Sequence, residues 1–226
     1  MQANDDQVLE KLLRGRFSCR AFLPKPVPRE AIERILSIAQ HTASWNNTQP
    51  WHLLITSGAE TEKFRQALIA QVMSGATPKT DLPWPREYIG TSLERRRECG
   101  FALYNAVGVP RGDKAAYAKQ GMENFRLFGA PHVAIVTSDE PLGPYGALDC
   151  GAYVTSFMTA AQSLGVATIA QAAVTQQGEF IHRYFGIPAS RMLVCGISFG
   201  YADKDHPVNN YRTTRVPIEA AAEFRG

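Results

Sequence analysis

The sequence predicts a fold of the α/β or α+β class, in which helices and strands alternate along the chain. Apolar runs at 132–138 (HVAIVTS) and 192–201 (MLVCGISFGY) are typical of buried strands. The stretch 31–40 (AIERILSIAQ) places its apolar residues along one face of an amphipathic helix. With 226 residues, of which 45% are hydrophobic and 20% charged, the chain is expected to form a single globular domain over 1–226.

The first half of the chain predicts helices around a strand. Helices are expected at 5–16, 31–40 and 60–73, and a strand is expected at 51–56. Asp5 is the expected N-cap of the first helix, and Gly15 lies near its end. A proline-rich stretch, FLPKPVPRE, connects the first two helices.

Residues 74 to about 100 are expected to leave the domain as an irregular excursion, because 74–92 is rich in proline and glycine. Long loops of this kind usually have a functional role or are mobile. The excursion carries Trp84, Tyr88 and Arg95, and we expect it to shape a pocket. Its sequence does not identify a substrate.

The second half of the chain predicts strands with helices between them. Strands are expected at 132–138, at 166–174, where the strand runs into a turn, and at 192–201. Helices are expected at 147–165 and, as a short helix, at 179–187. The helix at 147–165 is apolar on most faces, but Asp149 and Gln162 make it too polar for a membrane span. It is also too short for one. We therefore expect it in the core or in a subunit interface.

Charge and cysteine usage exclude several classes of protein. The net charge is only +3, and the basic run 95–97 lies between Glu94 and Glu98, as on a solvated helix face, so no nucleic-acid partner is expected. The first residues lack the apolar core of a signal peptide, which favours a cytoplasmic protein. Neither a zinc site nor a disulfide framework is expected from the widely spaced cysteines Cys19, Cys99, Cys150 and Cys195.

Familiar catalytic and ligand-binding motifs are absent or incomplete. GISFG, 196–200, matches the G-x-S-x-G pattern of serine hydrolases around Ser198, but turn residues follow it where that motif requires a helix. Asp203, Asp205 and His206 are neighbours in a turn and do not make a closed metal site. Neither G-x-G-x-x-G nor G-x-x-x-x-G-K-[ST] occurs, so side chains would have to hold the phosphate of any nucleotide-like cofactor.

Two arginine pairs near the ends of the chain fit that requirement. RFSCR carries Arg16 and Arg20 on either side of Ser18, and YRTTR carries Arg212 and Arg215 on either side of two threonines. Guanidinium groups and hydroxyls together match the acceptor oxygens of a phosphate. Either pair alone is also compatible with ordinary surface charge. Both pairs together, in a chain of modest net charge, favour an anion site.

The stretch ASWNNTQPW, 43–51, places polar side chains between Trp45 and Trp51. Amide groups bring both hydrogen-bond donors and acceptors, and indole rings bring flat apolar surface. This combination suits a flat ligand with a polar edge.

These segments together resemble the FMN-dependent nitroreductase family, most closely its branch of nitrobenzoate reductases. The resemblance covers almost the whole chain and is strongest in 16–55, which runs from RFSCR through ASWNNTQPW, and in 196–219 (GISFGYADKDHPVNNYRTTRVPIE). Central segments agree as well, at 124–136 (NFRLFGAPHVAIV) and 163–174 (SLGVATIAQAAV). The resemblance implies a central mixed, mainly antiparallel sheet flanked by helices, and a homodimer with a C-terminal extension.

The resemblance also implies a set of FMN-binding residues, some of them reaching the flavin from the partner subunit. No side chain is expected to be catalytic, and the main chain near Ala172 is expected to face the reactive edge of the flavin. Phe17 stands where the family pattern has a second arginine or a histidine, so one polar contact to the flavin is expected to be missing. Ala43 replaces the usual proline, and Trp45 stands where a small residue is common, so that its ring would either narrow the substrate pocket or stack on the flavin. The implied cofactor-binding residues are Arg16, Phe17, Ser18, Arg20, Ser44, Trp45, Asn47, Gln49, Ala170, Gln171, Ala172, Arg212 and Arg215.

The implied activity is the reduction of nitroaromatic or quinone-type acceptors with NADH or NADPH, through bound FMN and with ping-pong kinetics. Other chemistries on the same fold stay open, namely reductive dehalogenation, enone reduction and flavin fragmentation. So does a flavin-binding protein without turnover, while a serine hydrolase using Ser198 is a distant third reading.

Overall fold

A four-stranded sheet forms the centre of the computed structural model, which describes residues 4–226. The strands lie in the order β1-β2-β4-β3, and each neighbouring pair is antiparallel. Parallel pairing occurs in the described residues as isolated bridges, such as the one between Ser18 and Thr168. The strands are β1 (His52–Ser57), β2 (His132–Asp139), β3 (Ala167–Gln171) and β4 (Arg191–Gly200).

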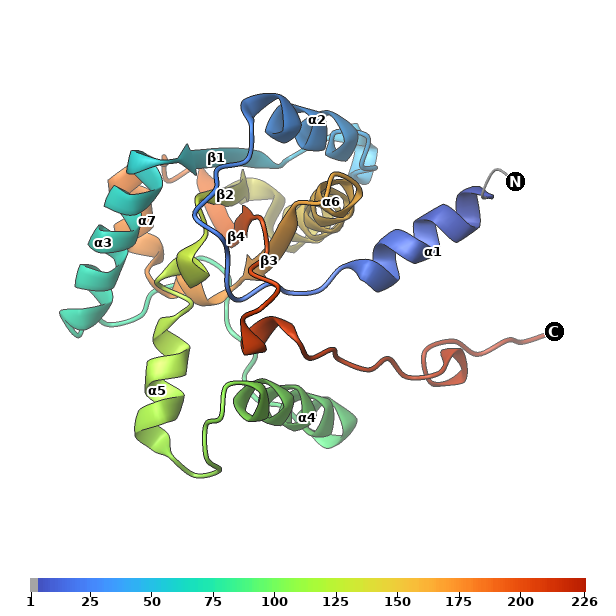
Figure 1. The fold of residues 1–226 in the computed structure, drawn as a ribbon. Helices are drawn as coiled ribbons and strands as arrows, with labels where there is room; N and C mark the ends of the chain where they lie inside the picture. The colour runs from blue at the N-terminus through green and yellow to red at the C-terminus, as the bar shows by residue number, and fades with distance from the viewer. Residues whose placement is uncertain (1–3) are drawn as a thin grey trace.

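Helices cover both faces of this sheet (Figure 1). The helices are α1 (Asp5–Gly15), α2 (Arg29–Ala39), α3 (Ala59–Met73), α4 (Gly90–Ala106), α5 (Lys114–Met122), α6 (Gly143–Ser163) and α7 (Gly178–Phe185). Helices α2 and α6 lie on one face, and α3 and α7 lie on the other. The predicted α/β or α+β class is therefore confirmed, with helices on both faces of an antiparallel sheet.

Strand β2 shows how the sequence builds the two core layers. Ala134 and Val136 pack with α2 and α6, whereas Val133 and Ile135 pack with α3 and α7. This is the alternation expected of a strand buried on both faces. The layers are completed by fully buried aromatic rings, including those of Phe64 and Phe157.

Helix α6 was expected in the core or in a subunit interface, and it has a buried side and an exposed side. Tyr153 and Phe157 are buried against the sheet, while Tyr145 and Leu148 are exposed. Within residues 4–226, no helix is both long and apolar enough to cross a membrane.

Two local expectations were wrong. Irregular structure was expected up to about residue 100, with a solvated helix face at 95–97. Helix α4 contains that face, but it begins already at Gly90. No residue of α4 is buried, so its apolar residues do not recur at helical spacing along one buried face. The sequence therefore gives no apolar periodicity that would indicate this helix. Asn4, rather than Asp5, is the N-cap of α1, and Asp5 and Asp6 lie in the first turn, where carboxylates favour the positive end of the helix dipole.

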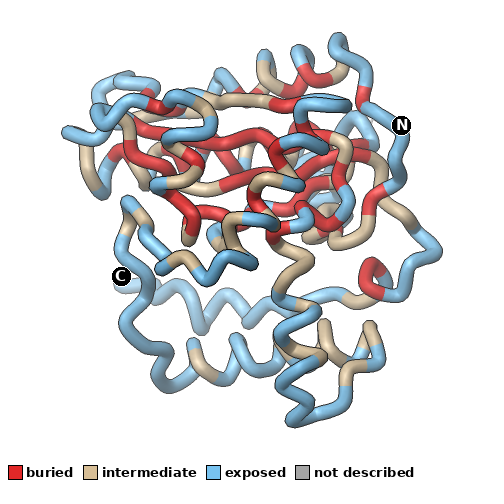
Figure 2. Tube along the Cα trace, turned by 90° about the vertical axis from the view of Figure 1, so that its left-hand side faces the viewer, coloured by how far each residue is buried: buried red, intermediate tan, exposed pale blue. Residues whose placement is uncertain are grey.

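Both ends of the described chain project from the body on the same side (Figure 1). Helix α1 and the last residues run outward there, and neither α1 nor the segment from Tyr211 onward contains a buried residue. Figure 2 shows the buried residues concentrated in the sheet and its covering helices, while the part around α4, α5 and the C-terminus is exposed.

Candidate functional site

A cavity of about 970 Å³ lies where these two ends leave the body. Its size is in the range of small-molecule sites. The sequence placed the two arginine pairs almost 200 residues apart, and the fold brings both to this cavity. Its lining includes Arg16, Phe17, Ser18, Arg20, Cys99, Tyr211, Arg212, Thr213 and Arg215.

Main-chain and amide hydrogen bonds hold these two segments in place. The N–H of Cys19 donates to the carbonyl of Thr168 on β3 at 3.0 Å, which fixes the first segment to the edge of the sheet. Asn209, which is 2% exposed, joins the second segment to the first. Its Oδ1 accepts from the Arg20 N–H at 2.9 Å, and its Nδ2 donates to the Ala21 carbonyl at 2.8 Å.

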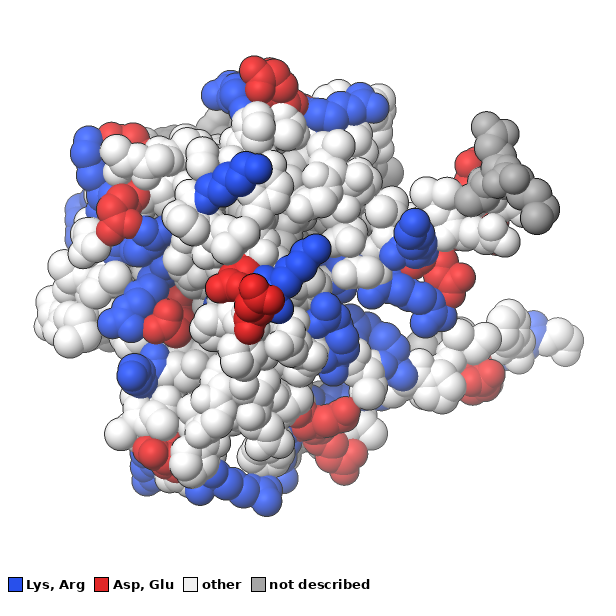
Figure 3. All heavy atoms as spheres, in the orientation of Figure 1, with Lys and Arg blue, Asp and Glu red and all other residues white. Residues whose placement is uncertain are grey.

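The cavity lining also includes Asp6, Glu10 and Arg14, and Arg14 pairs with Glu10, whereas its other four arginines form no ion pair in the described residues. Among residues 4–226, none of the ion pairs involves Arg16, Arg20, Arg212 or Arg215. Burial and the neighbouring charge of Arg215 lower the pKa of Arg16 below its usual value. Figure 3 shows Lys and Arg side chains gathered where the projecting ends leave the body. Such a cluster favours an anion with several acceptor oxygens.

Aromatic rings lie beneath two of these guanidinium groups. The guanidinium carbon of Arg212 is 4.0 Å from the centre of the Phe17 ring, and that of Arg20 is 5.7 Å from the centre of the Tyr211 ring. The Tyr211 hydroxyl is buried without a hydrogen-bond partner among the described residues. The cavity therefore combines cations with aromatic surface, and Phe17 contributes a ring where the family pattern has a cation.

The stretch Ser44–Gln49, which we call the amide turn, lies apart from this cavity within one chain. None of its residues is part of the cavity lining. Its side chains bond with one another: the Gln49 N–H donates to Ser44 Oγ at 2.9 Å, and Gln49 Nε2 donates to Asn47 Oδ1 at 3.0 Å. The fold brings together the polar residues of this turn, but it does not bring the turn to the arginines of the same chain.

Backbone conformation in the amide turn is strained. Asn46, Asn47 and Gln49 have φ angles of 49°, 58° and 45°, in the left-handed region that favours glycine. Asparagine tolerates this region, but glutamine does so less well. Gln49 also precedes Pro50, and a proline favours extended backbone in the residue before it. Such residues cost about 1–3 kcal/mol each, and they cluster at functional sites.

Trp45 points out of the molecule rather than into the cavity. Trp45 is 60% exposed, and its ring packs on the ring of Tyr145 of α6, with 5.0 Å between the two centroids. The main-chain N–H of Trp45 donates to both oxygens of the Asp149 carboxylate, at 3.1 and 3.3 Å. Asp149 thus fixes the first part of the amide turn to α6.

The end of β3 combines two exposed alanines with a buried glutamine. Ala170 and Ala172 are exposed, whereas Gln171 is 2% exposed. Gln171 Nε2 donates to the Asn124 carbonyl at 2.8 Å, and its Oε1 accepts from the Ser198 hydroxyl. Ser198 is fully buried inside β4, so the G-x-S-x-G match is a strand and not a hydrolase elbow.

Several residues of the site were not predicted from the sequence as site residues. Asn209 and Tyr211 lie next to the second arginine pair, and their position in the motif is the one signal that could have identified them. Cys99 reaches the cavity from α4, and Asp149 reaches the amide turn from α6. The contacts of these last two residues depend on the tertiary fold.

The fold is that of an α+β protein with an antiparallel sheet, and its cavity is rich in arginine side chains. Residues 13–201 match the model of the nitroreductase family, and the chain belongs to that family. The resemblance seen in the sequence is therefore confirmed.

Characterised relatives extend over nearly the whole chain. The nitroreductase NfnB of Mycolicibacterium smegmatis is 34% identical over 221 residues, which cover 96% of this chain and 93% of the relative. A 4-nitrobenzoate reductase of Pseudomonas putida is 32% identical over 220 residues, with 96% and 95% covered. The crystal structure of the FMN-dependent nitroreductase NfnB from Mycobacterium smegmatis in complex with NADPH superposes with a TM-score of 0.94, at 32% identity, covering 99% of this chain and all of that one.

Proposed function

We propose that this protein is an FMN-dependent NAD(P)H oxidoreductase that reduces nitroaromatic or quinone-type acceptors. The observation that carries the proposal is the cluster of Arg16, Arg20, Arg212 and Arg215, which form no ion pair within residues 4–226, in a cavity of about 970 Å³ of a nitroreductase-family chain. Bound FMN would supply the redox chemistry that couples oxidation of NADH or NADPH to reduction of the acceptor, with ping-pong kinetics.

The cavity residues fit the phosphate of FMN. Arg16, Arg20 and Arg215 supply charge-assisted donors, Ser18 supplies a hydroxyl, and Arg212 adds a further cation from the tail. Each hydrogen bond to a charged group contributes roughly 1.5–3 kcal/mol. The rings of Phe17 and Tyr211 offer flat surface beside these cations.

The remaining residues of the proposed site orient the flavin ring and provide no acid or base. The amide turn supplies donors and acceptors for the polar ring edge through Ser44, Asn47 and Gln49. The segment 170–172 would supply a main-chain N–H group to the flavin, as the family resemblance implies. The Gln171 side chain is occupied by internal hydrogen bonds and acts as a support.

A homodimer is part of the proposal, because the amide turn does not line the arginine cavity of its own chain. In a homodimer, the amide turn of one subunit would complete the cavity of the other. Exposed apolar side chains on α1, α6 and the tail, such as those of Leu9, Leu148 and Phe224, support burial by a second copy. A chain that sediments as a monomer and still retains FMN would contradict this part. The cytoplasmic location expected from the sequence stays a prediction.

An absorption spectrum of the purified protein tests the proposal. We expect a yellow protein whose visible absorption bleaches with NADH or NADPH in the absence of oxygen, and recovers when a nitroarene is added. A comparison of the two nicotinamides under the same conditions identifies the preferred reductant. A colourless protein that cannot be reconstituted with FMN would overturn the proposed function.

The variant Arg215→Ala tests the cavity directly. It removes a cation that faces Arg16, so the affinity for FMN is expected to fall about tenfold or more. Flavin content after gel filtration and a fluorescence titration with FMN measure the loss. A matched control is Arg34→Ala on α2, because Arg34 is exposed and does not line the cavity. If Arg215→Ala retains flavin as well as this control does, the role of Arg215 is wrong.

A further inference from the structure

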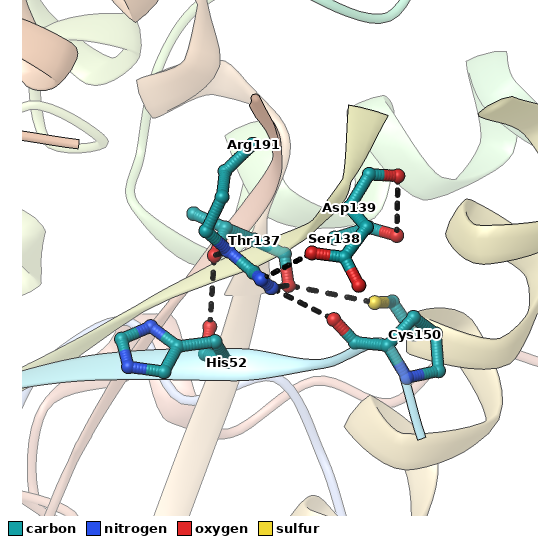
Figure 4. A network of polar contacts seen from close by, with 7 residues as sticks. His52, Thr137, Ser138, Asp139, Cys150 and Arg191 are labelled. Atoms are coloured by element: carbon teal, nitrogen blue, oxygen red, sulfur yellow. Dashed lines mark hydrogen bonds and ion pairs between the residues drawn. The ribbon is translucent and has the colours of Figure 1, made fainter. Parts of the chain in front are cut away.

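Arg191, the first residue of β4, connects the sheet to the end of the amide turn. Figure 4 shows its guanidinium group between Thr137 and Asp139 of β2. Nε donates to Thr137 Oγ1 at 2.7 Å, and Nη1 donates to Asp139 Oδ1 at 2.7 Å. Nη2 donates to the Thr137 carbonyl at 3.0 Å and to the carbonyl of Pro50 at 2.7 Å. One side chain therefore joins two neighbouring strands to Pro50.

The bond to Pro50 matters because of what precedes Pro50. Gln49 has a φ of 45°, and the rest of the amide turn is exposed or half-buried, so little apolar packing holds it. Its position depends on polar contacts at its two ends. At the start, Asp149 accepts from the Trp45 N–H, and at the end, Arg191 donates to the Pro50 carbonyl. A strained turn persists only when its surroundings hold it in place.

A second contact near the end of the turn gives the Gln49 side chain its direction. Trp51 Nε1 donates to Gln40 Oε1 at 3.1 Å, and Gln40 Nε2 donates to Gln49 Oε1 at 2.9 Å. These bonds form at the observed geometry only if Pro50, which lies between Gln49 and Trp51, stays in place. The hydrogen bond from Arg191 thus supports both the backbone and the side chain of Gln49.

We propose that Arg191 is a positioning residue that fixes the amide turn for binding FMN in the partner subunit. The inference rests on the proposed function, because it assigns the amide turn to the flavin ring. Arg191 does not touch the cavity residues and acts through Pro50. Supporting groups of this kind keep binding groups in their productive geometry.

The test compares Arg191→Met with Arg65→Met in the reconstituted full-length protein. Arg65 is a matched control because its side chain is 15% exposed, against 19% for Arg191, and it also donates to main-chain carbonyls, those of Arg126 and Ala130. Arg65 has no hydrogen bond to the amide turn. The readouts are the Kd for FMN by flavin fluorescence and amide hydrogen exchange of the peptide 43–51.

For Arg191→Met we expect about a tenfold higher Kd for FMN and faster exchange in 43–51. For Arg65→Met we expect a Kd close to that of the wild type. Equal losses in the two variants would show general destabilisation and overturn the proposal, as would a wild-type Kd in Arg191→Met.

Arg191→Lys keeps the test decisive if Arg191→Met does not fold. An ammonium group beside Asp139 retains the charge pair, but it cannot reproduce the guanidinium fork that also reaches Pro50. We expect weakened FMN binding in Arg191→Lys, and wild-type binding in it would overturn the proposal. A wild type that binds no FMN would overturn the proposed function itself, whereas normal FMN binding in the wild type and in both Arg191 variants would overturn this inference alone.

Discussion

Helices α6 and α4 are both long, with 21 and 17 residues, but they differ in what covers them. Helix α6 buries residues such as Tyr153 and Phe157 against the sheet, whereas no residue of α4 is buried. Helix α4 instead lines the cavity through Cys99, and its Glu98 accepts a hydrogen bond from Thr214 of the tail at 3.1 Å. In this chain, the helices that stabilise the fold are separate from the segments that line the arginine cavity.

The difference teaches where stability and function are located. Burial of apolar side chains is the main favourable contribution to folding, and it is concentrated around the sheet. The segments α1, α4 and the tail expose apolar and cationic groups that one chain alone does not cover. They are therefore suited to bind a ligand or a second copy, and mutations there should affect binding more than folding.

The largest effect that tests this comparison is expected in α6. Phe157 is fully buried, and Phe157→Ala should lower the free energy of unfolding by about 3–5 kcal/mol through lost burial and a cavity. Phe101→Ala in α4 is the matched control, because Phe101 is 36% exposed and its ring packs under the Arg111 guanidinium, so a loss below about 1 kcal/mol is expected. Urea unfolding measures both variants. Similar losses in the two would contradict the division between core and periphery.

A smaller effect is expected from pH, through a histidine at the start of β2. His132 Nε2 accepts the Val27 N–H at 2.9 Å, so the neutral ring carries its proton on Nδ1, which faces Ser57 Oγ. Burial lowers the pKa of His132 in the folded chain, so the unfolded chain takes up a proton first. The contribution of neutral His132 to the free energy of unfolding is complete above the unfolded pKa of about 6.5. It decreases as the pH falls below that value, by up to about 1.4 kcal/mol per pH unit.

Urea midpoints at pH 7, 6 and 5 measure this loss. His132→Gln should reduce the dependence on pH, and His41→Gln, which changes an exposed histidine, should leave it unchanged. An unaltered dependence in His132→Gln would show that other groups are responsible.

The smallest effect is expected in α1. Glu10 pairs with Arg14 at 2.6 Å, but the two side chains are 59% and 79% exposed. Glu10→Gln should change the free energy of unfolding by less than about 0.5 kcal/mol, because exposed pairs one helical turn apart contribute little. A measured loss above 1 kcal/mol would mean that α1 contributes to folding in a way that its lack of buried residues does not indicate.

The sequence predicted the parts of the fold that bury apolar residues. The strands at 132–138 and 192–201 and the helix at 31–40 were located because each buries a periodic apolar face. The start of α4 was missed for the converse reason, since an exposed helix needs no such face. Local pattern therefore predicts the core better than the periphery.

The same reasoning explains the candidate site. The arginine pairs were recognisable because short motifs carry their chemistry, and the fold brings them to one cavity. Arg191 could not be identified in advance, because its role depends on contacts with Pro50 and Thr137, which are distant in sequence. Neither pattern nor spacing indicates that an arginine at the start of a strand will reach the carbonyl of a turn.

The separation of the arginine cavity from the amide turn has a genetic consequence. In the proposed homodimer, each site takes its arginines from one polypeptide and its amide turn from the other. A chain altered at Arg215 and a chain altered at Gln49 are each expected to be defective alone. When the two are co-expressed, their mixed dimer contains one site with both defects and one with neither. Inactivating alleles of this gene would then fall into two complementation groups.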